Sequence, residues 1–396
     1  MQDDPSSLGA GTTTERCPFR GNVSLQDGRV LDHDPYEAFL EFAESDPFWA
    51  DYDGGTWVIT RYEHVREVQQ NYRVFTHTMP KYKLSDPLMP TEFDPPFQTK
   101  LRGIVLPLMT AARIDPLEPT MHEVCRELIS GFKDRGHCDV VEEFARKYPI
   151  AIFGELFGLE PERREEFRQL AETWMHDVSQ RQWAWTEIRA IIRGELEERR
   201  VAPKDDMLTG ISLGEIDGER IDIETGINLA ATVFLGGLDT LPSNIGWTLR
   251  FLATNPGHRR RIIEEPECVP GAVEEFFRRF PSVAKNACRA TRDLDFHGAN
   301  IKKGDLVHTI LFLANCDGEV FNDPLSLDFD RRGNKHIAFS VGSHRCLGSH
   351  LARHELAVGL QEWHAAIPEY RIADVDAITY TGGVLAMTYL PLEWDT

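Results

Sequence analysis

Hydrophobic residues recur at steps of three and four positions between residues 223 and 245, in the middle of the chain. This spacing keeps them on one face of an α-helix. Asp222 can cap the helix at its start, and the segment NPG at 255–257 can end it. The pattern therefore predicts one helix of about 33 residues, roughly 50 Å long at 1.5 Å per residue. Its apolar positions are Ile223, Ile227, Ala230, Phe234, Leu238, Leu241 and Ile245.

Shorter stretches with the same periodicity predict helices at 63–72, 95–109, 121–132, 161–178, 185–200 and 273–280. Alternation typical of strands is confined to 56–60, 306–310 and 384–392. The sequence contains no internal repeat and no Gly/Ser-rich or Pro-rich linker that would separate these elements. We therefore predict a single domain over 1–396, mainly α-helical with a minor β region.

Composition and charge narrow the class of protein. A chain of 396 residues with 41% hydrophobic content can bury a core large enough to hold a cofactor. A formal net charge of −21 disfavours nucleic acid and anionic membrane surfaces as partners. The N-terminal segment is polar and contains no secretory signal or membrane anchor, so we expect a cytoplasmic protein. Seven cysteines without a C-x-x-C pair predict mostly buried free thiols.

The long helix contains a stretch, FLGGLDTLPSN at 234–244, whose residues weaken helices. Each of Gly236 and Gly237 costs roughly 1 kcal/mol against alanine, and an interior proline such as Pro242 costs roughly 3 kcal/mol. Pro242 also lacks the N–H that would bond to the carbonyl of Leu238. We therefore predict that the helix is locally opened at this point.

A second stretch, FSVGSHRCLGSHLARHELAVGLQEW at 339–363, places Cys346 after a glycine-containing loop and at the start of a helix. Backbone N–H groups and the positive end of a helix dipole favour a thiolate at such a position. Gly342 and Gly348 let the backbone approach a neighbouring group closely. A cysteine taken alone is more often an inert buried thiol.

The residues Phe339, Gly342, Cys346 and Gly348 fit F-x-x-G-x-x-x-C-x-G and resemble the haem-binding loop of the cytochrome P450 family. DPPFQTKLR, GGLDT and EFFR also resemble the family's segments and follow in its order. The resemblance spans nearly the whole chain and is closest to the bacterial camphor-hydroxylating enzymes. It implies the P450 fold, with a long distal helix crossing a buried haem b, and Cys346 as the axial ligand of the iron.

The resemblance also implies roles for residues that would otherwise be ordinary surface charges or helix breakers. Arginine and imidazole side chains would bind the haem carboxylates, although Gln98 stands where many relatives carry histidine. The paired glycines would let the distal helix approach the haem. The expected cofactor-binding residues beyond the cysteine loop are Gln98, Arg102, Gly236, Gly237, Arg289 and His344.

Two further sets of residues acquire roles from the resemblance. Glu275 and Arg278 lie at i and i+3 and would normally form a surface ion pair worth about 0.3 kcal/mol. In the family they imply a buried structural network with a third partner, Arg331. Thr240 is expected to hydrogen-bond the oxygen ligand during catalysis, and Asp239 to supply protons from solvent. The alternative is that this pair only disrupts or caps the helix.

The substrate roof of the family corresponds to Thr76–Thr91 in this chain. Asp86 stands where the camphor enzymes carry a tyrosine that binds the camphor ketone, so we expect weak camphor binding. A wall of apolar residues suits a mostly hydrocarbon substrate, such as a terpenoid or an ionone-like ketone. Methionine and leucine residues are just as often ordinary core. The expected lining is Met79, Asp86, Leu88, Met89, Thr232, Leu235, Val283, Gly383 and Val384.

The chain contains no reductase domain or flavin motif, so its electrons are expected from a separate protein. Relatives use a [2Fe–2S] ferredoxin with an NADH-dependent ferredoxin reductase, and O2 is the second substrate. Lys100, Arg102 and Arg345 could present local positive charge to such a partner. Two alternatives remain, a peroxide-driven peroxygenase and a non-catalytic haem-thiolate sensor or carrier. The retained pair Asp239 and Thr240 argues against both.

Overall fold

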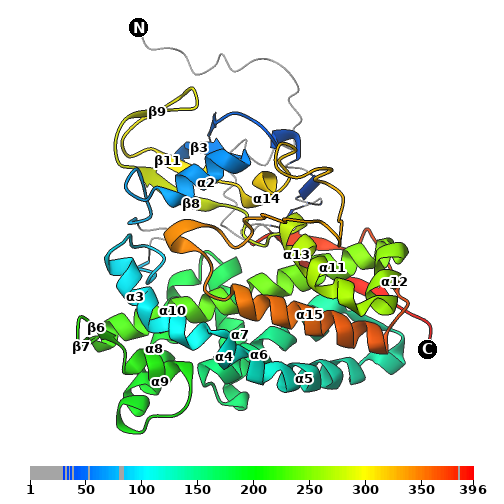
Figure 1. Ribbon diagram of the computed structural model, residues 1–396. Coiled ribbons are helices and arrows are strands. Elements are labelled where there is room, and N and C mark those ends of the chain that lie inside the picture. The colour runs from blue at the N-terminus through cyan, green and yellow to red at the C-terminus, as the bar shows by residue number, and fades with distance from the viewer. Residues whose placement is uncertain are drawn as a thin grey trace.

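The computed structural model describes residues 30–31, 34, 36–37, 40–51, 54–79, 84–381 and 384–396. Figure 1 shows a helical part beneath a smaller part that contains most of the β-structure. The segment that carries Cys346 runs between these two parts and leads into α15 (Ser349–Ala366). The architecture is that expected from the sequence, mainly α-helical with a minor β region.

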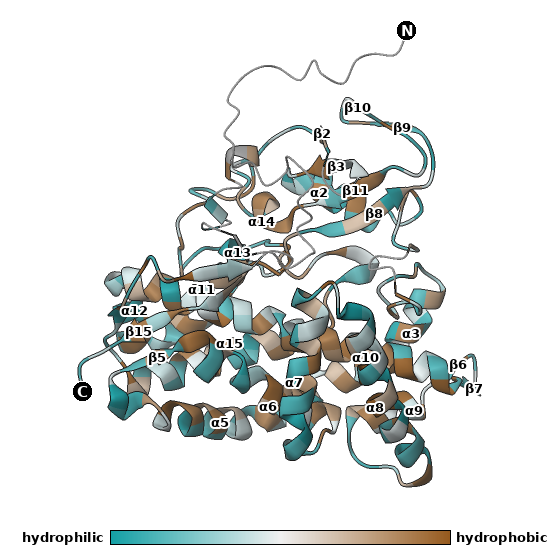
Figure 2. Cartoon of the chain, turned by 180° about the vertical axis from the view of Figure 1, so that it is seen from behind, coloured by the Kyte–Doolittle hydropathy of each residue, from teal (hydrophilic) through white to brown (hydrophobic). Residues whose placement is uncertain are grey.

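The helical part packs long helices against one another through apolar faces. Helix α10 lies in its interior and is largely hydrophobic, as Figure 2 shows. Among the described residues, no helix is both long and apolar enough to cross a membrane. The principal helices are α2 (Tyr62–Gln70), α3 (Phe97–Val105), α5 (Glu118–Ser130), α6 (Lys147–Phe157), α7 (Pro161–His176), α8 (Arg181–Val201), α10 (Ile223–Leu238), α11 (Thr240–Thr254), α12 (Pro256–Glu264), α13 (Val269–Arg279) and α15.

The largest sheet has five strands in the order β2-β3-β11-β8-β4. Strands β3 and β11 are parallel, and the other neighbours are antiparallel. The side chains of β8 alternate between two faces, so Asn286 and Arg289 point in opposite directions. The strands are β2 (Phe48–Ala50), β3 (Thr56–Ile59), β4 (Phe75–Thr76), β8 (Asn286–Ala290) and β11 (Leu306–Thr309).

The long helix expected between residues 223 and 254 is present as two helices, α10 and α11, that are separated by a single residue. Asp239 interrupts the helix with φ −107° and ψ −21°. Since α11 begins at Thr240, Pro242 falls in its first turn, where a missing N–H leaves no helical bond unmade. The prediction of an opened helix is therefore confirmed, and the opening precedes the proline by three residues.

Candidate active site

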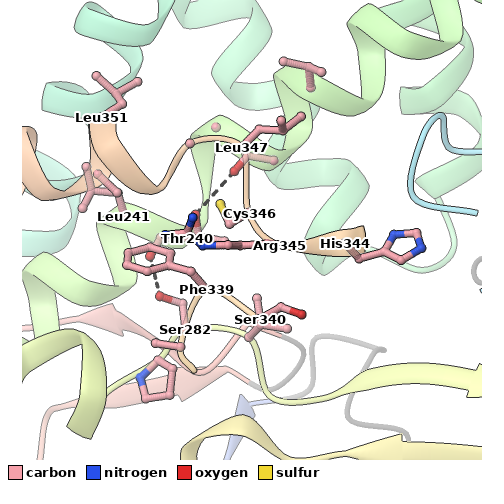
Figure 3. Close-up of a pocket in the computed structure, with 18 of the residues that line it drawn as sticks. Thr240, Leu241, Ser282, Phe339, Ser340, His344, Arg345, Cys346, Leu347 and Leu351 are labelled. Carbon is pink, nitrogen blue, oxygen red and sulfur yellow. Dashed lines mark hydrogen bonds between the residues drawn. The ribbon is translucent and has the colours of Figure 1, made fainter. Parts of the chain in front are cut away.

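A cavity of ≈ 300 Å³ lies between the α10–α11 junction and the loop that carries Cys346. Thr240 and Leu241 line it from the junction, while Cys346 and Leu347 line it from the loop (Figure 3). The side chain of Phe277, from α13, adds a further apolar wall. The structure therefore brings together the two stretches that the sequence singled out, although about 100 residues separate them in the chain.

The Cys346 loop is held in an unusual backbone conformation. Gly342 has φ +75°, and a Cβ there would lie 2.7 Å from the carbonyl oxygen of Gln69, so only glycine fits. The Gln69 side chain accepts hydrogen bonds from Ser340 Oγ (2.9 Å) and from the backbone N–H of Val341 (3.2 Å). The Cys346 N–H donates to the carbonyl of Phe339 at 2.8 Å, which closes the loop. These contacts fix the position from which the thiol faces the cavity.

The surroundings of the Cys346 thiol change its ionisation in opposite directions. Burial raises its pKa, while the backbone N–H of Gly348 and the guanidinium groups of Arg102, Arg345 and Arg353 lower it. The net shift is upward, although the thiol itself is exposed to the cavity. Helix α15 begins at Ser349, and its N-cap residue Gly348 supplies the backbone N–H that favours the thiolate. A bound metal ion would supply the missing stabilisation, because a coordinating thiol is deprotonated by the metal.

The two glycines of the opposite wall have different surroundings. A Cβ at Gly236 would meet no atom within 4 Å, so this glycine borders open space in the cavity. A Cβ at Gly237 would lie 3.0 Å from the ring of Phe153, so this glycine makes room for the packing of α10 against α6. Of the pair, Gly236 is the one that leaves space for a group lying across the cavity.

Two hydrogen bonds position Thr240, one through its backbone carbonyl and one through its side-chain hydroxyl. Its carbonyl accepts from Ser282 Oγ at 2.6 Å, as Figure 3 shows. Ser282 also bonds to the Asn244 side chain at 2.7 Å, which ties the first turn of α11 to the segment after α13. The Thr240 hydroxyl donates weakly to the Gly236 carbonyl at 3.4 Å. A bond this long is readily exchanged for one to a ligand in the cavity.

Asp239 does not line the cavity and turns to a histidine that the sequence analysis missed. His176 Nε2, at the last residue of α7, lies 3.3 Å from Asp239 Oδ2, and both side chains are mostly buried. Burial lowers the pKa of His176, but the Asp239 carboxylate outweighs it and the net shift is upward. His176 is thus a titratable group in contact with the expected proton donor. A histidine in the last turn of a helix carries no sequence signal for this role, because its partner is 63 residues away.

Charged residues continue from His176 toward the molecular surface. Glu172, one turn earlier in α7, lies 3.3 Å from Arg146 Nε, and burial raises its pKa. Arg146 also bonds to Glu142 at 3.0 Å, and the Glu142 side chain is 45% exposed. The Glu172 carboxylate also acts to raise the pKa of His176, so these charged groups form part of the surroundings of the His176 and Asp239 pair.

The residues expected to hold cofactor carboxylates lie at the Cys346 end of the cavity. Arg102 lines the cavity and donates to the Arg345 carbonyl at 2.7 Å. His344 also lines it, and its Nε2 lies 3.9 Å from Asp94 Oδ1. Gln98 is fully buried behind them, and its amide donates to the Ser343 carbonyl at 2.6 Å. Gln98 therefore supports the cysteine loop from behind.

The position of Arg289 contradicts the expectation that this residue binds the cofactor. Arg289 is exposed, donates to the Gly304 carbonyl at 2.8 Å and does not line the cavity. Its neighbour on the opposite face of β8, Asn286, does line the cavity. Because side chains alternate along a strand, an odd separation places Arg289 on the wrong side of the sheet for a carboxylate in the cavity. The spacing of motifs in the sequence does not show on which face of the strand Arg289 lies.

The residues around the cavity suit the cofactor that the resemblance implies. A single thiol faces an apolar space walled by Leu241, Phe277 and Leu351, and Arg102 and His344 lie at its polar end. A flat apolar ring with two carboxylates and a metal that takes one sulfur ligand matches this set of groups. Glu355, which also borders the cavity, is buried with one carboxyl oxygen unpaired, and burial raises its pKa well above the ordinary value. Burial therefore favours the protonated form of this carboxyl group at the wall of the cavity.

Glu275, Arg278 and Arg331 form the buried network that the resemblance implied. Arg278 makes two bonds to the Glu275 carboxylate, at 2.7 and 2.9 Å, and both side chains have no exposed surface. Arg331 Nε donates to Glu275 at 2.9 Å. Arg278 also donates to the carbonyls of Asn315, Pro324 and Ser326, which fasten the loop preceding the cysteine segment to α13.

The expected substrate-lining residues divide into four groups. Thr232 and Val283 line the cavity, as do Pro90 and Thr91 of the roof segment. Asp86 is withdrawn into an ion pair with Arg189 at 2.6 Å and does not line the cavity. Gly383 lies outside the described residues. The other expected residues pack in the core and are not among those that line the cavity: Met79, Leu88, Met89, Leu235 and Val384.

Comparisons with known proteins agree with this geometry. The family model for cytochrome P450 matches residues 184–363. A probable cytochrome P450 127A1 from Sinorhizobium fredii is 33% identical over 347 residues, covering 86% of this chain and 84% of that protein. The vitamin D(3) 25-hydroxylase of Pseudonocardia autotrophica is 30% identical and covers 89% of this chain and 91% of its own length. The crystal structure of CYP101J2 superposes with a TM-score of 0.87 at 29% identity, covering 97% of this chain and 100% of that one.

Proposed function

The chain belongs to the cytochrome P450 family, and on this premise we propose that it oxidises a small to medium hydrophobic substrate of the terpenoid or ionone-like class. It is a P450 monooxygenase with haem b as cofactor. The observation that carries the proposal is the apolar cavity between Cys346 and the opened helix at Asp239 and Thr240. We further propose that residues 1–396 act as one domain in the cytoplasm.

The protein's contribution is to hold the cofactor and to control the protons. Cys346 would ligate the iron, and Arg102 and His344 would hold the carboxylates. The haem, when bound, supplies the iron that activates O2, and thiolate ligation favours cleavage of the O–O bond. Gly236 leaves space on the opposite wall. The apolar side chains of the cavity exclude water, which limits unproductive proton transfer.

Proton delivery is assigned to residues at the helix opening. The Thr240 hydroxyl gives up its long bond to Gly236 and donates to a ligand in the cavity. Asp239 exchanges protons with His176, which is in contact with it and has a raised pKa. Glu172, whose charge acts on His176, is the neighbouring carboxyl group placed to exchange protons with this pair. The direct transfer is between Asp239 and His176, whose side-chain atoms lie 3.3 Å apart.

The substrate is held mainly by apolar burial. Thr232 uses its hydroxyl proton in a bond to the Asn228 carbonyl at 2.8 Å, so it offers no free donor to the substrate. Asp86 is engaged by Arg189 and does not line the cavity. Both facts favour a substrate with few polar groups. Vitamin D3 is a second candidate, because one relative is named for its hydroxylation.

The substrate class is tested by titrating the ferric enzyme with ligands and following the haem spectrum. We expect ionone-like terpenoid ketones to bind at least about tenfold more tightly than camphor, because Asp86 stands where the camphor enzymes carry their tyrosine, and that ratio corresponds to about 1.4 kcal/mol. Vitamin D3 is the third ligand compared in this titration. Tight camphor binding with efficient hydroxylation would contradict the account of the roof, and binding of vitamin D3 alone would favour the second candidate.

We propose that electrons come from a [2Fe–2S] ferredoxin and its NADH-dependent reductase. Arg345 is exposed beside Cys346, and Arg102 borders the same loop, so a positive patch lies close to the expected sulfur ligand. Lys100 contributes less, because it is paired with Asp217. A ferredoxin that docks through such charges should reduce the enzyme more slowly as ionic strength rises. Stopped-flow reduction at low and high salt measures this dependence, and a rate that does not change with salt would argue against charge-based docking.

A further inference from the structure

Two histidines and a carboxylate meet on the surface of α15, outside the cavity. His350 and His354 are one helical turn apart, and Asp115 begins the short helix η5 (Asp115–Leu117) that precedes α5. Nε2 of His350 lies 2.9 Å from Asp115 Oδ1, and Nε2 of His354 lies 3.6 Å from the same oxygen. One ligand atom from each residue lies within 4.8 Å of the other two. Three potential metal ligands therefore converge on one point.

The residue types and their spacing match a transition-metal site. Histidines at i and i+4 project from the same side of a helix and can bind one ion together. Two imidazoles with one carboxylate are borderline ligands that suit Zn²⁺, and they leave a fourth, tetrahedral position for water. We propose that Asp115, His350 and His354 form a binding site for a divalent transition-metal ion, with Zn²⁺ as the best-matched ion.

The surroundings allow an ion to enter. The side chains of Asp115, His350 and His354 are 54%, 39% and 27% exposed, so solvent reaches the cluster and can supply the remaining ligand. Another histidine, His122, also lies beside carboxylates, with Nδ1 2.6 Å from Glu362, but it contributes only one imidazole. It is a matched control, because it shares the acidic surroundings and lacks the second histidine.

An ion at this site would join two segments that are distant in the sequence. It would fasten the first turns of α15, which follow directly from the Cys346 loop, to the segment that leads into α5. A ligand that binds only the folded state raises its stability. We therefore expect Zn²⁺ to raise the melting temperature of the wild type, with no requirement for turnover.

The test uses untagged, haem-loaded protein, in which Cys346 is expected to be occupied by iron. Isothermal titration calorimetry with Zn²⁺ should give one saturable site per chain. His350→Ala and His354→Ala should each weaken binding by at least about tenfold and abolish the rise in melting temperature. His122→Ala should bind as the wild type does. Unchanged spectra of the reduced carbon monoxide complex would show that each variant is folded.

Two results would overturn the proposal. One is the absence of saturable zinc binding in the wild type, which would leave the cluster as a surface ion pair. The other is binding that survives in both His350→Ala and His354→Ala, which would place the ion elsewhere. Neither result bears on the proposed oxidation reaction, because binding and melting are measured without substrate or reductant.

Discussion

Thr240 and Asp239 adjoin each other in the sequence but face different neighbours. The Thr240 side chain borders the cavity, whereas Asp239 contacts His176. One residue is therefore placed to direct a proton to a ligand in the cavity, and the other to bring that proton from outside. Their separate surroundings predict separate effects of mutation.

Thr240→Ala removes the hydroxyl that faces the cavity but leaves the backbone bond to Ser282 intact. We expect this variant to bind haem and substrate and to consume NADH, but to release much of the oxygen as hydrogen peroxide. The measurement is product formed per NADH consumed, together with the peroxide released. Thr232→Ala is a matched control on the same cavity wall and should remain coupled. Unchanged coupling in Thr240→Ala would mean that water or another group controls the proton.

The raised pKa of His176 predicts that both the stability of the folded protein and product formation depend on pH. The contact with Asp239 raises its pKa above the ordinary value of 6.5, so its positive charge stabilises the folded protein fully below about pH 6.5 and is lost as pH rises through the raised pKa. Product formation should fall over the same range, because neutral His176 cannot return a proton to Asp239. His176→Gln cannot titrate and should lack this decline, whereas the exposed His137→Gln should keep it. A decline that persists in His176→Gln would exclude His176 from the proton route.

For individual residues, the sequence predicted a functional role where the residue stands in a local motif. Cys346 and Thr240 could be found because the loop and the helix breakers surround them in the chain. His176 could not, because its importance depends on the packing of α7 against a distant turn. Arg289 was misplaced because a motif does not show which face of a strand a residue occupies.

At the scale of elements, the opening between α10 and α11 is the feature on which the site depends. Apolar periodicity predicted one helix through this region, because α10 and α11 follow each other with one residue between them and both bury an apolar face. The breakers predicted that the helix opens, but not that the interruption lies at Asp239. Helices α6 and α12 and strand β8 were not predicted, since they are short or lack a clear period.

Pro242→Ala tests what keeps the helix open. The alanine N–H could donate to the Leu238 carbonyl and favour a continuous helix, in which an interior proline would cost about 3 kcal/mol. We expect a higher melting temperature and lower coupling of NADH to product, because the opening beside Thr240 would narrow. If melting and coupling both match the wild type, the Ser282 bond to the Thr240 carbonyl holds the opening without the proline.

At the scale of the whole molecule, distant parts of the chain converge on the Cys346 loop. Gln69 from α2 and Gln98 from α3 bond to its backbone, and the Glu275 and Arg278 network fastens the segment before it. The family resemblance predicted this network and the fold, because they depend on motifs. The neighbours Gln69 and Ser282 were not predicted, since their contacts arise only when the elements pack.

The central claim is that Cys346 is the axial ligand of a haem held in this cavity. The most direct test is the absorption spectrum of the reduced protein with carbon monoxide, compared between the wild type and Cys346→Ala. We expect the wild type to absorb at the position typical of thiolate-ligated haem, and Cys346→Ala to lose that band. Cys268→Ala, a buried cysteine that does not line the cavity, should keep it. A thiolate-type band that persists in Cys346→Ala would contradict the account.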